Sequence, residues 1–162
     1  AIHWMNSYSE YTGDLKKWYS DNVSPEFDTC RQRIANLLRE ESQLMEIVKL
    51  IGSDILPEDQ KLVIETARLI RVGFLQQNSY HPMDTYVPLK KQLLMMQMIL
   101  RLYDGAKEGI DRSIPLSQYI DTGVFDAVVK MKYEIPNEDL SKFDDYAALI
   151  DNALEQVNTA NS

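Results

Sequence analysis

Apolar residues recur at alternating three- and four-residue steps along the first part of the chain, which is the spacing of one helix face. The first such run follows Ser24-Pro25, where a capping hydroxyl precedes a proline at the first helical position. Gly52 is predicted to end this helix, and Glu41 is the one polar interruption of its apolar face. The apolar positions are Phe27, Cys30, Ile34, Leu37, Leu44, Val48 and Ile51.

Two further long helices follow. Pro57 fits the first turn of the second, which we expect to run to about Gln77. Because the connection between the first two helices is short, they are predicted to form an antiparallel hairpin. Pro88 is expected to begin the third helix, whose end Gly105 and Gly109 should weaken. The second helix is expected to bury Leu62, Ala67, Leu69, Ile70 and Phe74. In the third helix the apolar residues at heptad steps are Leu89, Leu93, Met96, Leu100 and Tyr103.

The last third of the chain also has helical periodicity. Residues 115–132 predict one or two small helices broken near Gly123, and a final helix is expected to begin near Asn137. Its apolar positions are Leu140, Phe143, Ala147, Ile150, Leu154 and Val157. Residues 158–162 are expected to fray. No stretch alternates like a strand, so we predict an all-α fold, a helical bundle with a long antiparallel helix hairpin, in a single domain over residues 1–162.

Composition excludes some classes of function. The 162 residues correspond to one ordinary domain, and a hydrophobic content of 44% is enough for a core. The net charge of −8 disfavours binding to a nucleic-acid backbone and suits anionic membranes poorly. No apolar run approaches the roughly 18 residues of a membrane span, and the lone Cys30 cannot form an internal disulfide. We therefore expect neither a nucleic-acid partner nor direct membrane insertion.

The sequence contains no evident catalytic or metal-binding constellation. Its 6 glycines never take the spacing of a phosphate-binding loop, so the chain alone is not expected to hydrolyse ATP. His3 and His81 lie far apart, and a loop histidine bonded to nearby backbone is favoured over a metal ligand. Met95, Met96 and Met98 are favoured as adaptable core residues over a partner-binding groove.

Two segments carry further chemistry. Residues 74–86 combine amides and aromatic rings around a proline, which suits the binding of a heteroaromatic base, although a helix-end cap with packed tyrosines is the alternative. The acidic turn from Asp54 to Asp59 is expected to expose Ile55 and Leu56 between acids. Such a turn suits contact with a basic helical partner, and a merely solvated turn is the alternative.

Both segments resemble a known family. The stretch Phe74-Leu-Gln-Gln-Asn-Ser-Tyr-His-Pro-Met-Asp-Thr-Tyr86 resembles the Phe-Leu-Gln-Gln-Asn-Ala-Phe-x-Pro-x-Asp-Thr-Tyr signature of the catalytic A subunit of archaeal/vacuolar-type rotary ATPases. Residues 2–9 resemble that family's Ile-x-Trp-Leu-x-Ser-Tyr-Ser, and the likeness continues over residues 18–25. It covers essentially the whole chain, as the C-terminal helical domain of that subunit. Val87-Pro88 departs from the small polar residues usual there.

The resemblance implies a parent subunit that couples ATP synthesis or hydrolysis to H⁺ or Na⁺ transport, with ATP or ADP and Mg²⁺ as its ligands. The phosphate-binding loop would belong to a missing N-terminal portion. This chain, as an excised fragment, would then bind no cofactor and catalyse nothing alone. The implied partners are the central-stalk subunits and the B subunit, in the peripheral part of a membrane-bound complex on the cytoplasmic side.

Two sets of site residues follow from the resemblance. In this family the loop after the second helix lines the adenine end of the nucleotide pocket. That role falls here to Tyr80, which stands where most relatives have Phe, and to Tyr86, Gln76, Gln77 and Asn78. The turn after the first helix is similar in position to the Asp-Glu-Leu-Ser-Glu-Glu-Asp loop of the related F-type catalytic subunit, which touches the rotating stalk. The stalk contact is thus assigned to Asp54, Ile55, Leu56, Glu58 and Asp59, with no catalytic residue and no metal ligand.

One alternative from another class of function stays open. The chain could be a free-standing acidic helical adaptor that binds a basic partner helix through the acidic turn or the Met-rich face. The coding sequence upstream of Ala1 would separate the two, because the ATPase hypothesis requires further domains there.

Overall fold

The computed structural model describes residues 25–75 and 88–161, and these residues form helices and turns with no strand. The all-α prediction is confirmed. The helices are α2 (Glu26–Ile51), the 3₁₀-helix η1 (Ser53–Ile55), α3 (Glu58–Arg68), the π-helix η2 (Leu69–Leu75), α4 (Leu89–Asp111), α5 (Leu116–Asp121), α6 (Val124–Val129), α7 (Met131–Glu134) and α8 (Lys142–Ala160).

Prolines and a glycine set the helix boundaries as the sequence predicts. Pro57 and Pro88 directly precede α3 and α4, where their fixed φ suits the helix start. Gly52 ends α2 with a φ of 84°, and its N–H donates to the carbonyl oxygen of Val48 at 2.9 Å. The helical path after Pro57 continues to Leu75, but as a π-helix from Leu69 onward.

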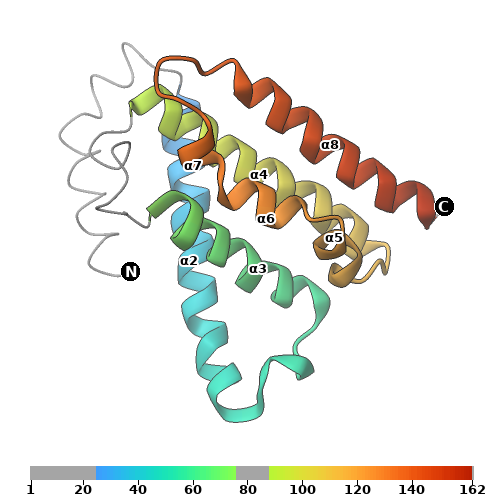
Figure 1. The fold of residues 1–162 in the computed structure, drawn as a ribbon. Helices are drawn as coiled ribbons and strands as arrows, with labels where there is room; N and C mark the ends of the chain where they lie inside the picture. Colours follow the sequence, from blue (N-terminus) through green and yellow to red (C-terminus); the bar gives the residue numbers. More distant parts are fainter. Residues whose placement is uncertain (1–24, 76–87, 162) are drawn as a thin grey trace.

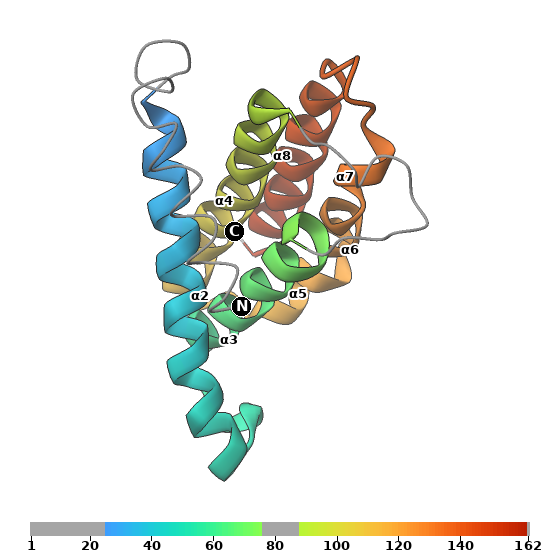
Figure 2. The same cartoon turned by 90° about the vertical axis from the view of Figure 1, so that its left-hand side faces the viewer.

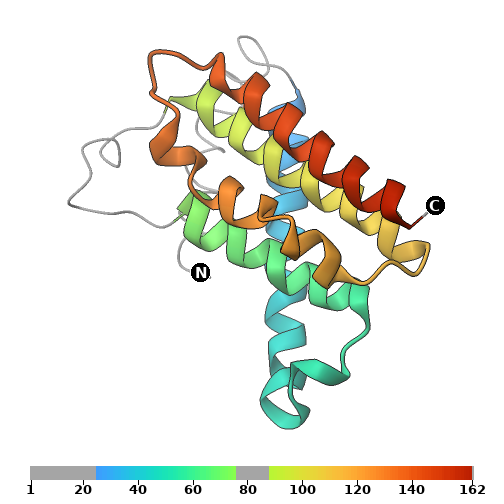
Figure 3. The same cartoon turned by 45° about the vertical axis from the view of Figure 1, so that its right-hand side comes forward.

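Helix α4 lies at the centre of the bundle. It packs against α2, α3, α5, η2 and α8, and α8 runs beside it along most of its length (Figures 1 and 3). Helix α2 crosses this bundle, with its N-terminal half packed against it and its C-terminal end projecting beyond the other helices (Figure 2). The three methionines of the α4 core, Met95, Met96 and Met98, are 1%, 0% and 6% exposed, so the prediction that they are core residues is confirmed.

Helix α4 continues through both glycines near its end, Gly105 and Gly109, and ends at Asp111. Gly109 is required for close packing, because a Cβ there would overlap the hydroxyl oxygen of the fully buried Tyr119 on α5. The helix propensity lost at glycine is thus offset by tertiary contact, which sequence propensity does not include.

Helix α8 differs from the expectation at both ends. It begins at Lys142 and not near Asn137, because the carboxylate of Asp139 accepts hydrogen bonds from the backbone N–H and hydroxyl of Ser141 and so forms a turn. At the other end the helix continues to Ala160, within the range expected to fray. Asn161 ties this end down, since its amide nitrogen donates to the carbonyl oxygen of Val157 at 2.7 Å and to Gln118 of α5 at 2.6 Å.

The first two long helices contact each other, as expected, but they diverge toward their connection. Helix α3 packs against α2, while the C-terminal end of α2 reaches past it (Figure 1). The apolar face of α2 is buried from Phe27 to Leu44. The same face is exposed at its last position, Ile51, which is 51% exposed, so the apolar pattern extends further along the chain than the packing does. The long antiparallel hairpin in its strict form stays a prediction.

Candidate functional site

Exposed apolar side chains gather at the projecting end of α2. Of the seven large apolar residues that are exposed in the described part of the chain, four lie within nine positions. We call these four the apolar tip: Ile47 (41% exposed), Leu50 (85%), Ile51 (51%) and Ile55 (66%). Clustered exposed apolar residues are typical of interaction sites, whereas single ones need no explanation. The geometry therefore indicates a contact surface at this end of the molecule.

Sequence reasoning missed two members of the apolar tip, Ile47 and Leu50. A signal was present, because Ile47, Val48, Leu50 and Ile51 make the end of α2 apolar on more than one face. One helix face packs on the bundle, so a helix apolar on further faces must have another partner or expose them. Periodicity alone does not show where the packing ends along a helix.

The predicted stalk-contact residues divide into two groups. Asp54 and Ile55 lie in η1 and are exposed, as expected. Leu56 was expected to be exposed, and this is wrong, since it is only 6% exposed. The reason is local geometry: Leu56 has an extended backbone (φ −67°, ψ 143°), so the chain leaves the 3₁₀ turn there and returns toward α3.

Glu58 is tied to the body of the bundle. Its Oε1 accepts a hydrogen bond from the backbone N–H of Leu116 at 2.9 Å, and its Oε2 lies 3.2 Å from Nζ of Lys61. The Leu116 hydrogen bond and the Lys61 ammonium lower the pKa of this carboxyl below its usual value. Glu58 therefore joins the start of α3 to the start of α5 and is not a free acid of the tip.

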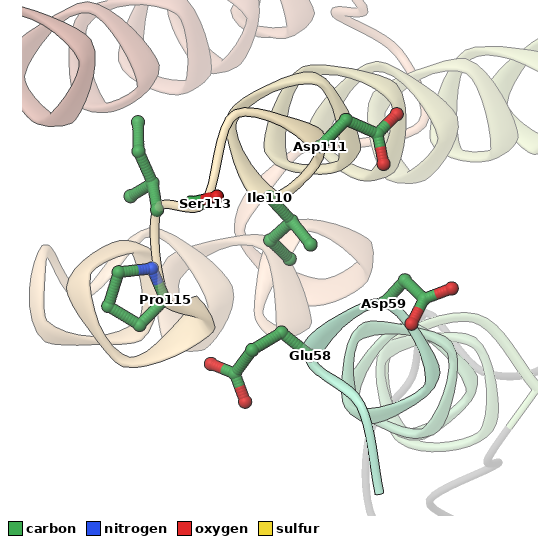
Figure 4. Close-up of a pocket in the computed structure, with 7 residues that line it drawn as sticks. Glu58, Asp59, Ile110, Asp111, Ser113 and Pro115 are labelled. Carbon is green, nitrogen blue, oxygen red and sulfur yellow. The ribbon is translucent and has the colours of Figure 1, made fainter.

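Asp59 is exposed beside the same junction. Together with Glu58 and Asp111 it lines an open depression of about 530 Å³ between α3 and the α4–α5 connection (Figure 4). Ser113, with a φ of 75°, shapes the opposite wall. Of the three acids assigned to the stalk contact, only Asp54 lies in η1 beside the apolar tip, while Glu58 and Asp59 begin α3.

The predicted adenine-contact residues Gln76, Gln77, Asn78, Tyr80 and Tyr86 lie outside the described residues. The helices on either side of them are firmly packed. Phe74 of η2 is 8% exposed, and Lys91 in the first turn of α4 is fully buried. The positions flanking this segment in the chain are thus parts of the core.

Lys91 is a buried cation with a complete set of acceptors. Its Nζ donates to the carbonyl oxygens of Lys132 and Ile135, at 2.8 and 2.6 Å, and to Oδ1 of Asn137 at 2.9 Å. Burial and the nearby charge of Lys132 lower the pKa of Lys91 to about 8. The side chain joins α4 to the end of α7 and the connection that follows it.

Other kinds of site find little support within residues 25–75 and 88–161. No three His, Cys, Asp or Glu side chains gather there as metal ligands would. None of the helices in these ranges has the length and hydropathy to cross a membrane. Cys30 is buried, and burial raises the pKa of its thiol, as expected for a core cysteine and not for a reactive thiolate.

Comparison with known proteins places these features in a family. Residues 16–120 match the family described as the C-terminal domain of V and A type ATP synthase. The chain is 48% identical to V-type ATP synthase alpha chain 2 of Clostridium tetani over 141 residues, which are 87% of this chain and 24% of that relative. It is 44% identical to the V-type ATP synthase alpha chain of Halothermothrix orenii over 151 residues, or 93% of this chain and 26% of that relative.

A more distant relative extends the match over almost the whole chain. The A subunit of the A-type ATP synthase of Methanopyrus kandleri is 39% identical over 158 residues, which are 97% of this chain and 26% of that relative. The chain thus spans about a quarter of the length of the relatives it matches. The matched family range includes the apolar tip, both helices that adjoin it and all of α4. The chain belongs to the family of C-terminal domains of V and A type ATP synthases.

Proposed function

We propose that this chain works as the C-terminal domain of the catalytic A subunit of a rotary ATPase that couples ATP synthesis or hydrolysis to H⁺ or Na⁺ transport. In this role it completes the adenine end of the nucleotide pocket and transmits motion to the central stalk. ATP or ADP with Mg²⁺ is bound by the whole catalytic chain, whose partners are the stalk subunits and the B subunit. The complex has its peripheral part on the cytoplasmic side of the membrane.

The observation that carries the stalk contact is the apolar tip on a projecting helix, in a chain of this family. Leu50 is 85% exposed, and burying such a side chain against a partner contributes roughly 1.5–3 kcal/mol. Asp54 is the exposed acid of the adjoining turn, so it adds charge at the edge of an apolar contact. The proposed contact is therefore mainly apolar and not acidic, because two of the three assigned acids, Glu58 and Asp59, begin α3 and do not lie in η1.

The adenine role rests on the residues between η2 and α4. An aromatic ring at Tyr80 would stack on the base, and the amides of Gln76, Gln77 and Asn78 supply hydrogen-bonding groups for its edge. In the intact complex, Tyr80→Ala should weaken nucleotide binding by roughly 5- to 150-fold, on the scale of base stacking on an aromatic. Unchanged ATP affinity would contradict the adenine role.

Cross-linking tests the stalk contact. In the assembled complex, a cysteine introduced as Leu50→Cys or Asp54→Cys should form a cross-link to one of the stalk subunits. Glu155→Cys, on the exposed face of α8, is the matched control and should not cross-link to the stalk. Cys30 contributes little background because it is buried. Absence of cross-links at both tip positions would count against the contact.

The adaptor alternative has less support. Its Met-rich face is buried in α4 and therefore cannot receive a partner helix. In its other surface, the acidic turn, Glu58 already accepts a hydrogen bond from the backbone N–H of Leu116. The family match favours the ATPase subunit over a free-standing adaptor.

A further inference from the structure

Glu41, the polar residue on the apolar face of α2, forms an ion pair with Arg71 of η2. Its side chain is 14% exposed, and its Oε1 lies 2.6 Å from Nη2 of Arg71 in the π-helix η2. The buried residues Leu38 and Leu44 flank Glu41 in sequence on α2. The pair therefore joins α2, shortly before its exposed end, to the last helical segment before Gln76.

Stability alone is a weak reason for this pair. The Glu41 side chain is 14% exposed and that of Arg71 is 34% exposed. Such a partly buried ion pair is often no more stabilising than well-packed apolar residues of similar size, because both charges lose part of their hydration. The Nε of Arg71 is also buried and has no hydrogen-bond partner, which adds a cost. However, separation of the two partners leaves each charge uncompensated. The free energy of the pair is thus sensitive to the relative position of α2 and η2.

The segment that carries Arg71 is itself unusual. η2 is a π-helix of 7 residues, a form that is rare and is frequently found at functional sites. It is fixed to the bundle at Gly73, where a Cβ would lie only 3.1 Å from Cα of Val129 in α6. η2 therefore has one close backbone contact with α6 and one charged contact with α2, and it leads directly into the residues assigned to adenine.

We propose that Glu41 and Arg71 form a positioning pair that couples the position of the apolar tip to the nucleotide segment after η2. This inference rests on the proposed function. When the stalk displaces the end of α2, Glu41 moves with its helix. If Arg71 keeps its contact with Glu41, it moves with α2 and shifts η2. If it does not move, the ion pair with Glu41 breaks. In both cases the position of the tip changes the free energy of η2, which is the definition of coupling between two sites.

The test uses the assembled complex with its full-length subunits, prepared with and without the central stalk. The measured quantity is the ratio of the ATP dissociation constants in the two preparations. Coupling of ordinary strength corresponds to a ratio of roughly 5 to 150. In Glu41→Gln and in Arg71→Met this ratio should fall several-fold toward one, with the affinity of the stalk-free complex within about twofold of the unmodified complex. A pair that is merely structural would leave the ratio unchanged.

Two further variants sharpen the result. Arg33→Met removes a different pair between α2 and the bundle, in which Nη1 of Arg33 donates to Oδ2 of Asp104 at 2.9 Å, and it should keep the full ratio. The double exchange Glu41→Arg with Arg71→Glu should regain part of the ratio, and it serves also if a single variant does not assemble. If every Glu41 and Arg71 variant keeps the ratio of the unmodified complex, the inference about this pair is wrong, and the proposed function is unaffected. A ratio of one in the unmodified complex would overturn the stalk coupling of the proposed function as well.

Discussion

The hydroxyl of Tyr119 lies directly over Gly109, and it donates a hydrogen bond to Oδ1 of Asn158 at 3.1 Å. One phenol thus joins α5, α4 and α8, and it does so only because α4 has no side chain at this position. Gly109→Ala should destabilise the chain by about 1–3 kcal/mol through overpacking, despite the better helix propensity of alanine. The free energy of unfolding in urea measures this effect.

A second variant, Tyr119→Phe, tests whether the contact between Gly109 and Tyr119 causes this effect. In Tyr119→Phe the hydroxyl is removed, so the added methyl group of Gly109→Ala meets less obstruction. The double variant should therefore be more stable than the sum of the single effects predicts, by an interaction free energy above about 0.5 kcal/mol. Strict additivity would show that the two residues do not interfere.

Lys91 should make the stability of the chain depend on pH. Its pKa is about 8 in the folded protein, below the ordinary value of 10.5, so the unfolded chain binds more protons between these values. Stability from this group should rise with pH above 8, by up to about 3 kcal/mol near pH 10.5. Urea unfolding at pH 7.5, 8.5 and 9.5 measures the rise as a difference from a variant without Lys91, because Cys30, whose pKa burial raises, lowers the stability of both proteins over the same range.

Lys91→Met is the matched variant for this prediction, because it keeps the length of the side chain and removes the titrating group. Its free energy of unfolding should lack the rise between pH 8 and 9.5 that the unmodified chain shows. Parallel curves for the two proteins would contradict the assignment of the pH dependence to Lys91. A loss of stability that is equal at all three pH values would report only the missing hydrogen bonds.

Two neighbouring residues of the turn after α2 should respond oppositely to truncation. Leu56→Ala removes a side chain that is 6% exposed and should cost about 2–5 kcal/mol, as core leucines do. Ile55→Ala removes one that is 66% exposed and should change the stability of the chain by no more than about 0.5 kcal/mol. Thermal or urea unfolding distinguishes them, and an equal loss in both would mean that the tip is packed.

Asn161 should hold the end of α8 to α5. Asn161→Ala removes the hydrogen bonds to Val157 and Gln118, so we expect a loss of about 0.5–1.5 kcal/mol for each of them. Amide hydrogen exchange should become faster in the last turn of α8 and remain unchanged in its first turns. Asn152→Ala, at an exposed position of the same helix, is the control and should leave the exchange pattern as it is.

Helix type and most of the core were predictable because they depend on local pattern. Pro57, Pro88 and Gly52 act within their own turn of the chain, and each marks the boundary it predicts. The expected core positions Leu62, Ile70, Phe74 and Ile150 are all buried, since helical periodicity selects the face that packs. The later start of α8 was missed because the Asp139–Ser141 turn competes with helix over the same few residues.

The turn after α2, to which the stalk contact is assigned, adjoins a group of exposed apolar side chains, but its own side chains are arranged otherwise than expected. Leu56 is buried and Glu58 accepts a hydrogen bond from Leu116, which is 58 residues away in the chain. Ile47 and Leu50 belong to the surface, although the predicted apolar face includes neither. Exposure depends on which other helices reach a position, and spacing along the chain does not contain that information.

The sequence by itself determined the all-α class, most helix boundaries and, through the signature in residues 74–86, the family. These follow from local backbone preferences and from the order of residues. Only the tertiary structure decided the uses of Gly109, Lys91 and Glu41, whose residue types are unfavourable at these positions when the helix is considered alone. Glycine weakens a helix, and a buried charge is costly, unless a residue distant in the chain supplies the compensating contact. Such partners meet only when the helices pack.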